Sequence, residues 1–334
     1  VDGRLPGAGG DPAAVGVQIG SRGGRGDAGH GSVRAGWRAA GYPSILVSRT
    51  AVSPRGLKMN ASLLDRRTFL AAGAAACTLA AGRGSAAPAA ARPTIGLQLY
   101  SLRGYKVDEA LRHAKDLGFT HVEVYSGMFP ITDDAAAIAA QRKLVSDLGL
   151  TISAHGINKF SKDAAENRKA FAYGKALGVS IIGADPEPEA FDSLDDLVKE
   201  FDIRIAIHNH GPTHRYNKVV DVLRAIEGRD PRIGACADLG HFIRSGEKPV
   251  DVIRAFKGRL YGIHLKDFAE MQDKTKGVIL GKGHIDVPAV FAALAQVGFP
   301  ADGALSIEYE ENKDNPLADI RECLRVAREA AARA

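Results

Sequence analysis

The feature that most constrains this chain is a regular alternation that begins at Thr94. Short apolar runs alternate with stretches of helical period, which predicts a parallel sheet whose strands are joined by helices. The predicted strands are Thr94–Tyr100, His121–Tyr125, Thr151–His155, Ser180–Ala184, Arg204–His208, Ile233–Asp238, Leu260–Lys266 and Leu305–Glu310. The predicted helices are Asp108–Leu117, Ala135–Leu148, Ala164–Leu177, Lys218–Ile226, Val250–Phe256 and Pro288–Val297, with less regular ones near Leu194–Lys199 and Arg321–Ala334. Eight such units favour a single closed (β/α)₈ TIM barrel over an open sheet.

The ends of four helices repeat one pattern. Leu-Gly or Val-Gly closes the helix at Gly118, Gly149, Gly178 and Gly298, and an apolar strand follows. Glycine just past a helix adopts the left-handed conformation without a Cβ clash. The recurrence therefore marks one βα unit used several times.

The first 58 residues have a different composition. They contain 14 glycines, eight Lys and Arg and three Asp, so the formal excess of +5 lies entirely there, and the remaining residues balance at 36 of each sign. A nucleic-acid site is expected as a basic patch on the folded domain, which this distribution does not supply. We expect residues 1–58 to be a disordered upstream extension that is not native, and no nucleic-acid partner.

Residues 59–91 have the three parts of a signal peptide. Asp65-Arg66-Arg67-Thr68-Phe69-Leu70 is followed by an Ala-rich apolar stretch and then by small residues at 85–91. A charged start, an apolar centre and a small-residue end are typical of export signals, and the paired arginines resemble a twin-arginine signal. We expect translation to begin at Met59, export to the periplasm, and a barrel domain of residues 92–334. The alternatives are an Ala-rich helix after a linker and a lipid anchor on Cys77. The sequence contains no run of about 18 apolar residues, so it predicts no membrane-spanning helix.

Polar residues gather where the predicted strands end. Barrel enzymes place their active sites at the carboxyl ends of the strands. The candidates there are Glu123, His155, His208, His210, Asp238, His241, His264, Lys266, Glu308 and Glu310, with Tyr100 ending the first strand. They cannot all be packed in apolar surroundings, because unpaired buried charge is too costly.

A mixed set of imidazole and carboxylate groups suits Mn²⁺, Co²⁺, Zn²⁺ or Fe²⁺, and Mg²⁺ less well. We expect a divalent metal held by His208, Asp238, His264 and Glu308. The alternative is a hydrogen-bonded polar network without metal. Glu123, His155 and Tyr100 are predicted to contact substrate, and Glu123 could instead support a ligand side chain.

Several motifs together resemble the sugar phosphate isomerase/epimerase family, a xylose-isomerase-like group of barrels. They are Gln98–Arg103, Gly118–Glu123, Asp238–His241, His264–Asp267 and Gly281–Asp286, and the resemblance spans Pro93 to about Ala330. It implies a metal-dependent barrel that acts on a keto-sugar or polyol. It also implies metal ligands at the ends of strands 5 to 8, which map to His208, Asp238, His264 and Glu308.

The resemblance favours an isomerase or epimerase that works through an enediolate. Glu308 would move the proton, with His210 or His241 as alternatives, and Lys266 would neutralise the developing oxyanion. The family's ketose epimerases carry Glu at the strand-5 position, where this chain has His208, as in members resembling inosose dehydratase. The alternative is therefore an exported dehydratase or lyase acting on a 3-keto-glycoside or inosose. An endonuclease IV-like phosphodiesterase and a non-catalytic sugar-binding protein are weaker alternatives. The expected partner is a small carbohydrate, and a homo-oligomer is compatible with the sequence.

Overall fold

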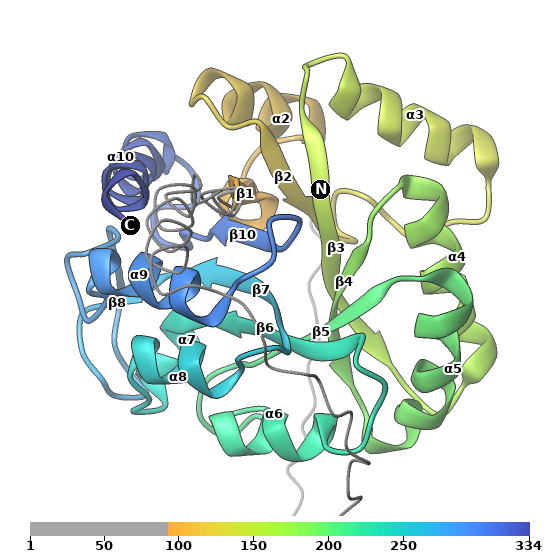
Figure 1. Ribbon diagram of the computed structural model, residues 1–334. Helices are drawn as coiled ribbons and strands as arrows, with labels where there is room; N and C mark the ends of the chain where they lie inside the picture. Colours follow the sequence, from red (N-terminus) through yellow and green to blue (C-terminus); the bar gives the residue numbers. More distant parts are fainter. Residues whose placement is uncertain (1–92) are drawn as a thin grey trace, which may run out of the picture. The chain divides into compact units, whose positions relative to one another are not determined.

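The computed structural model describes residues 93–334, which form a closed barrel of eight parallel strands (Figure 1). The predicted upstream extension and signal peptide lie outside the described residues. The barrel strands are β1 (Ile95–Gln98), β2 (His121–Val124), β3 (Thr151–Phe160), β4 (Ile181–Pro186), β5 (Arg204–His208), β6 (Ile233–Asp238), β7 (Leu260–Leu265) and β10 (Ala304–Ile307). They neighbour one another in chain order, and β10 closes the barrel against β1. The predicted fold class is confirmed.

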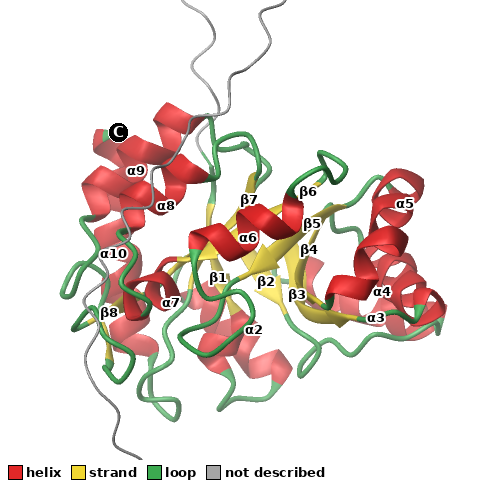
Figure 2. Cartoon of the chain, turned by 90° about the horizontal axis from the view of Figure 1, so that it is seen from below, coloured by secondary structure: helices red, strands yellow, loops and turns green. Residues whose placement is uncertain are grey.

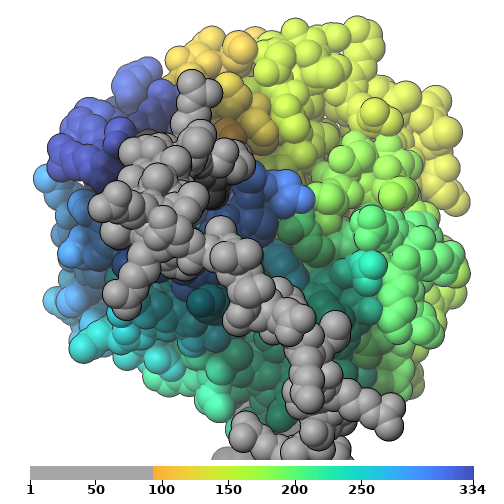
Figure 3. Space-filling model, viewed as in Figure 1, coloured from red at the N-terminus to blue at the C-terminus, as the bar shows by residue number. Residues whose placement is uncertain are grey.

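Helices surround the strands, as the turned view in Figure 2 shows. They are α2 (Val107–Asp116), α3 (Ala135–Ser146), α4 (Ala164–Leu177), α5 (Phe191–Phe201), α6 (Val219–Ile226), α7 (Leu239–Arg244), α8 (Pro249–Ala255), α9 (Val287–Val297) and α10 (Leu317–Arg333). In Figure 3, successive segments follow one another around the circumference of the barrel. Among the helices of residues 93–334, none combines the length and apolar character needed to span a bilayer.

The four predicted glycine caps are confirmed. Gly118, Gly149, Gly178 and Gly298 all have left-handed backbones, with φ between +66° and +93°. A side chain at these positions would strain the turn from helix into strand. The local signal that sets the length of each βα unit is thus read correctly from the sequence.

The largest differences from the predicted elements lie at the mouth of the barrel. β1 ends at Gln98, and Leu99–Leu102 forms the 3₁₀ helix η1, because the Gln98 side chain accepts the backbone N–H of Tyr100 (3.1 Å) and turns the chain. β10 ends at Ile307, before Glu308 and Glu310. Helix α7 directly follows β6 and was not predicted.

A two-stranded hairpin at the mouth was also not predicted. Its strands are β8 (Asp267–Phe268) and β9 (Gly277–Val278), which pair antiparallel. The buried Asp267 carboxylate accepts five backbone N–H groups at 2.8–3.1 Å, those of Phe268, Gly281, Gly283, His284 and Ile285. The Gly281–Gly283 segment wraps this carboxylate.

The interior of the barrel is divided by polarity. Small apolar side chains, Ala154, Ala206, Cys236 and Ala304, form one buried cluster with Ile181. Buried polar and charged residues occupy the carboxyl ends of the strands. The fold therefore collects the ionisable groups at one end of a packed core.

Candidate metal centre and active site

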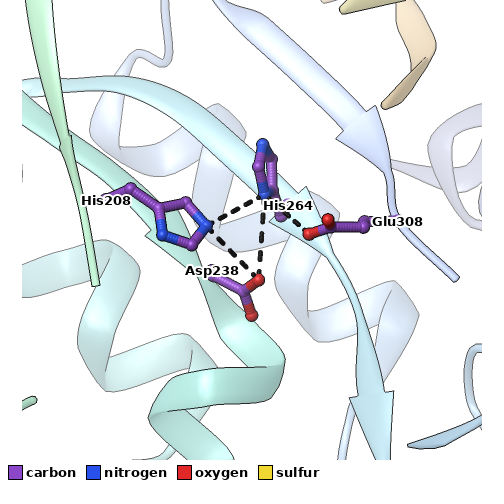
Figure 4. Close-up of side chains that lie close together, drawn as sticks. All are labelled: His208, Asp238, His264 and Glu308. Atoms are coloured by element: carbon purple, nitrogen blue, oxygen red, sulfur yellow. Dashed lines mark hydrogen bonds and ion pairs between the residues drawn. The ribbon is translucent and has the colours of Figure 1, made fainter. Parts of the chain in front are cut away.

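Four consecutive strand ends bring two imidazoles and two carboxylates together (Figure 4). His208 ends β5, Asp238 ends β6, His264 lies in β7, and Glu308 follows β10. One ligand atom from each residue lies within 4.8 Å of all the others. This is the set predicted from the sequence, and the structure places all four side chains in one group.

The distances show which atoms converge. His264 Nδ1 lies 2.9 Å from Glu308 Oε2, 3.2 Å from His208 Nε2 and 3.7 Å from Asp238 Oδ2. His208 Nε2 lies 3.5 Å from the same Asp238 oxygen. Two nitrogen and two oxygen donors facing one point fit a divalent transition metal. The metal's identity is not determined by this donor set.

Glu123 lies behind this group and does not line the cavity beside it. Its Oε1 lies 3.1 Å from His264 Nε2, and its Oε2 accepts the Ser306 hydroxyl at 2.7 Å. Its side chain is 1% exposed. A carboxylate behind a ligating imidazole fixes the ring and raises its basicity. Of the two roles considered for Glu123, the geometry therefore agrees with support of a ligand and disagrees with substrate contact.

Asp238 is held by contacts that its position in the sequence did not reveal. Asn209 clamps its backbone through two hydrogen bonds, donating to the Asp238 carbonyl (3.0 Å) and accepting the Asp238 N–H (2.8 Å). Asp238 Oδ1 also accepts the His241 N–H at 2.7 Å and so caps α7. One carboxylate oxygen therefore starts the helix while the other points into the group.

Lys266 is the cation of the site. Its buried Nζ binds Glu310 and lies 3.4 Å from Asp238 Oδ2, Glu308 Oε2 and His241 Nε2. Burial opposes the charged form, but the carboxylates of Asp238 and Glu308 outweigh it and raise the lysine pKa. Lys266 is thus held protonated beside the proposed ligands.

The same contacts act on the metal-site groups. Burial disfavours ionised Glu308, but Lys266 and His264 overcome it and lower the pKa of Glu308 to about 2. Burial likewise opposes protonated His264, yet the neighbouring acidic groups, Glu123 and Glu308 among them, raise the pKa of His264 well above its usual value. The group therefore contains ionised carboxylates and a protonated His264.

His210 and His241 complete the rim of a cavity of about 360 Å³ that also contains Tyr100, Tyr125, Lys266 and Glu310. Burial lowers the pKa of each of these two imidazoles to about 3, so both are neutral near pH 7. A cationic side chain lies at each ring nitrogen of His241: Arg244 is 3.3 Å from Nδ1, and Lys266 Nζ is 3.4 Å from Nε2.

The predicted substrate contacts separate into two groups. Tyr100 is 39% exposed and lines the cavity, with Tyr125 packed edge-on at 5.4 Å. His155 is buried, contacts the Phe129 carbonyl (3.0 Å) and Asn158, and does not line this cavity. This position does not support the prediction that His155 contacts substrate. The prediction rested on strand alternation, which gives the direction of a side chain but not its depth below the mouth of the barrel.

A second group, Asp185, His210 and His214, lies beside the first. His214 Nδ1 accepts the Tyr216 N–H (3.3 Å), and its Nε2 lies 3.4 Å from Asp185 Oδ2. This group is an imidazole–carboxylate pair next to His210.

The chain resembles known proteins along much of this barrel. It is 30% identical over 148 residues to inosose dehydratase of Clostridium tetani, covering 39% of this chain and 48% of that protein. It is 28% identical over 190 residues to 3-oxo-isoapionate decarboxylase of Pectobacterium atrosepticum, covering 49% of this chain and 66% of that one. The chain thus spans about half the length of the inosose dehydratases that it matches.

A solved structure has a similar fold. An uncharacterised protein from Parabacteroides distasonis is 28% identical, with a TM-score of 0.56, covering 71% of this chain and 98% of that one. The model of the xylose isomerase-like TIM barrel family matches residues 111–330. The chain belongs to the xylose isomerase-like TIM barrel family.

Proposed function

We propose that this chain is a metal-dependent carbon–oxygen lyase that removes the proton beside the ketone of a carbohydrate and then expels an oxygen from the next carbon. The observation that carries the proposal is the convergence of His208, Asp238, His264 and Glu308 beside a buried lysine. Three of these four side chains and the lysine line one cavity. The cavity volume, about 360 Å³, lies in the range of small-molecule sites.

His208, Asp238, His264 and Glu308 would hold the metal. When bound, a divalent cation there supplies Lewis-acid stabilisation of the charge that develops on a carbonyl oxygen. We propose a transition metal such as Mn²⁺, Co²⁺ or Zn²⁺, because two of the four donors are imidazoles.

The remaining steps use this chain's own side chains. Glu308 takes the α-proton, with His210 or His241 as alternatives, since all three line the cavity. The C–H electron pair passes into the enediolate and then forms a carbon–carbon double bond as the β C–O bond breaks. Lys266 gives a proton to the departing oxygen, so that proton uptake and release balance. A proton acceptor and a proton donor within reach of the reacting carbons are what such an elimination requires.

Isomerisation or epimerisation, expected from the family resemblance, is the second candidate. It shares the first proton transfer but returns the proton to carbon. Elimination is favoured because His208 stands where the family's ketose epimerases carry a glutamate. The four converging residues therefore do not include two glutamates that could exchange a proton across the substrate. The similarity to inosose dehydratases over part of the chain supports the same choice.

We also retain periplasmic export as a proposal, with residues 59–91 as its signal and residues 1–58 as an upstream extension. Cell fractionation with a lysine pair in place of Arg66 and Arg67 tests it. Export predicts that the wild-type chain reaches the periplasm in shortened form and that the variant stays in the cytoplasm.

The function is tested with the purified chain, loaded with Mn²⁺ and incubated with a 3-keto-glucoside in D₂O. NMR follows the α-carbon and the products. Deuterium at the α-carbon with release of the alcohol supports a lyase, whereas deuterium in an intact rearranged sugar supports the isomerase. No exchange with this substrate or with a panel of free ketoses and inososes would refute both.

A further inference from the structure

We infer that a second cavity, beneath the β8–β9 hairpin, receives the leaving group, and that this group is a neutral, hydroxyl-rich ring. The inference rests on the proposed lyase function and names its substrate class: a keto-glycoside with a second sugar ring, and not a sugar phosphate.

The second cavity adjoins the metal site directly. It has a volume of about 320 Å³ and shares four lining residues with the first cavity, which are His241, Lys266, Glu308 and Glu310. Lys266 therefore stands at the junction of the two cavities. A substrate with its keto ring at the metal group can extend past Lys266 into the second cavity.

The hairpin forms a roof that is tied to the barrel on two sides. Arg244 of α7 donates to the Asp273 carbonyl at 3.0 Å and to its carboxylate at 3.1 Å. On the other side, Glu311 Oε1 accepts the Gly277 N–H at 2.8 Å. These contacts give the cavity a defined wall, which distinguishes it from a space between unattached loops.

The lining disfavours an anion. Glu308, Glu310 and Glu311 all line the cavity. Of its three cations, Arg244 is paired with Asp273 and Lys266 with Glu310, and the third, Lys274, is outnumbered by the lining carboxylates. Phosphate brought beside three carboxylates would be repelled. Phe268 adds an aromatic surface next to these polar groups, with the Arg244 guanidinium 5.5 Å from its ring centre. Apolar ring faces combined with hydrogen-bonding groups suit a neutral sugar.

The position of Lys266 matches the bond that would break. Elimination cleaves the bond between the β-carbon of the keto ring and the bridging oxygen. The bridging oxygen keeps the electron pair, takes a proton from Lys266 Nζ and leaves as a hydroxyl of the second ring. With the keto ring in the first cavity and the second ring beneath the hairpin, the bridging oxygen lies at the junction where Lys266 is held.

The test compares two leaving groups in the purified, metal-loaded chain. The substrates are a methyl 3-keto-glucoside and a 3-keto-disaccharide that releases glucose. Val278→Trp fills the cavity from β9, and Lys274→Trp fills it from an exposed position of the hairpin, where folding is least at risk. We expect each variant to lower the ratio of kcat/KM, disaccharide over methyl glycoside, by about tenfold. The matched control Val220→Trp, on an exposed part of α6 that lines neither cavity, should leave both values unchanged.

The outcomes distinguish failure of the second-cavity inference from failure of the proposed lyase function. Turnover of both substrates with a ratio that neither tryptophan variant changes would overturn the second cavity but leave the lyase intact. Turnover of neither would refute the lyase, and calorimetric titration of wild-type and Val278→Trp protein with the unoxidised disaccharide would then still decide whether the cavity binds a neutral ring. Competitive inhibition by inorganic phosphate that Lys274→Ala relieves would overturn the neutral-ring assignment.

Discussion

Glu123→Gln tests whether the buried carboxylate supports a metal ligand. Glu123 Oε1 lies 3.1 Å from His264 Nε2, and the carboxylate is 1% exposed, so water cannot replace it. Glutamine keeps the volume and can still accept from His264 while its amide group faces the Ser306 hydroxyl. What is lost is the negative charge that raises the basicity of the imidazole.

The expected loss is partial. Removing the carboxylate partner of a ligating histidine typically weakens metal binding 10- to 100-fold, which corresponds to about 1.4–2.8 kcal/mol. Titration of Mn²⁺ or Zn²⁺ into the metal-free chain, with a chelator as competitor, measures this directly. Glu310→Gln is the matched control, because Glu310 contacts Lys266 and none of the four converging atoms. Metal affinity of Glu123→Gln equal to that of wild type would refute the reasoning, as would an equal loss in the control.

Four further predictions follow from the same geometry. Asp238→Ala and His264→Ala should each abolish stoichiometric metal binding while circular dichroism still reports a folded barrel, and metal retained in either variant would refute the ligand set. Metal binding should release protons at pH 7, because acidic neighbours raise the pKa of His264 in the metal-free site and its Nδ1 must lose a proton to ligate. Calorimetry in buffers of different ionisation enthalpy measures this, and no release would contradict the raised pKa of His264. Asp267→Ala should lower the free energy of unfolding by about 3 kcal/mol or more, because five backbone N–H groups lose their acceptor. Urea unfolding measures this loss beside that of the surface control Asp302→Ala, and equal losses in the two variants would count against the explanation. Burial lowers the pKa of His210 from 6.5 to about 3, so the unfolded chain takes up this proton at a higher pH than the folded chain. The free energy of unfolding should therefore fall as pH decreases from about 6.5 towards 3. In urea unfolding across that range, His210→Gln should show a shallower decline, and an unchanged slope would refute this role of His210.

The sequence was sufficient for the fold because its signals are local. Apolar strands, helical periods and glycine caps such as Gly118 and Gly178 depend on neighbours within one βα unit. The rule that strand ends meet at one mouth then brings His208, Asp238 and His264 together without further information. Those features required no knowledge of distant contacts.

The parts that were missed depend on contacts between distant segments. Asp267 acts through backbone groups 14 to 18 residues further along the chain, and the hairpin roof depends on Arg244 meeting Asp273. His155 was expected to contact substrate, and Glu123 to contact substrate or support a ligand. Both side chains are buried and neither lines the cavity. Alternation along a strand gives the direction of a side chain but not its depth.

The charge balance of the site bears on the choice between a metal centre and a polar network. Four carboxylates, those of Glu123, Asp238, Glu308 and Glu310, lie in a largely buried region. Among residues 93–334, the cations paired with them are Lys266 and His264. A network of hydrogen bonds alone must keep His264 protonated and still leaves four carboxylates against two cations. Buried charge without compensation is costly. A divalent cation that displaces one proton from His264 leaves one more positive charge in the group and turns two imidazoles into ligands. Replacement of a proton by a divalent cation therefore accounts for three features at once: the donor set, the supporting Glu123 and the raised pKa of His264. A hydrogen-bonded network needs a separate explanation for each of them.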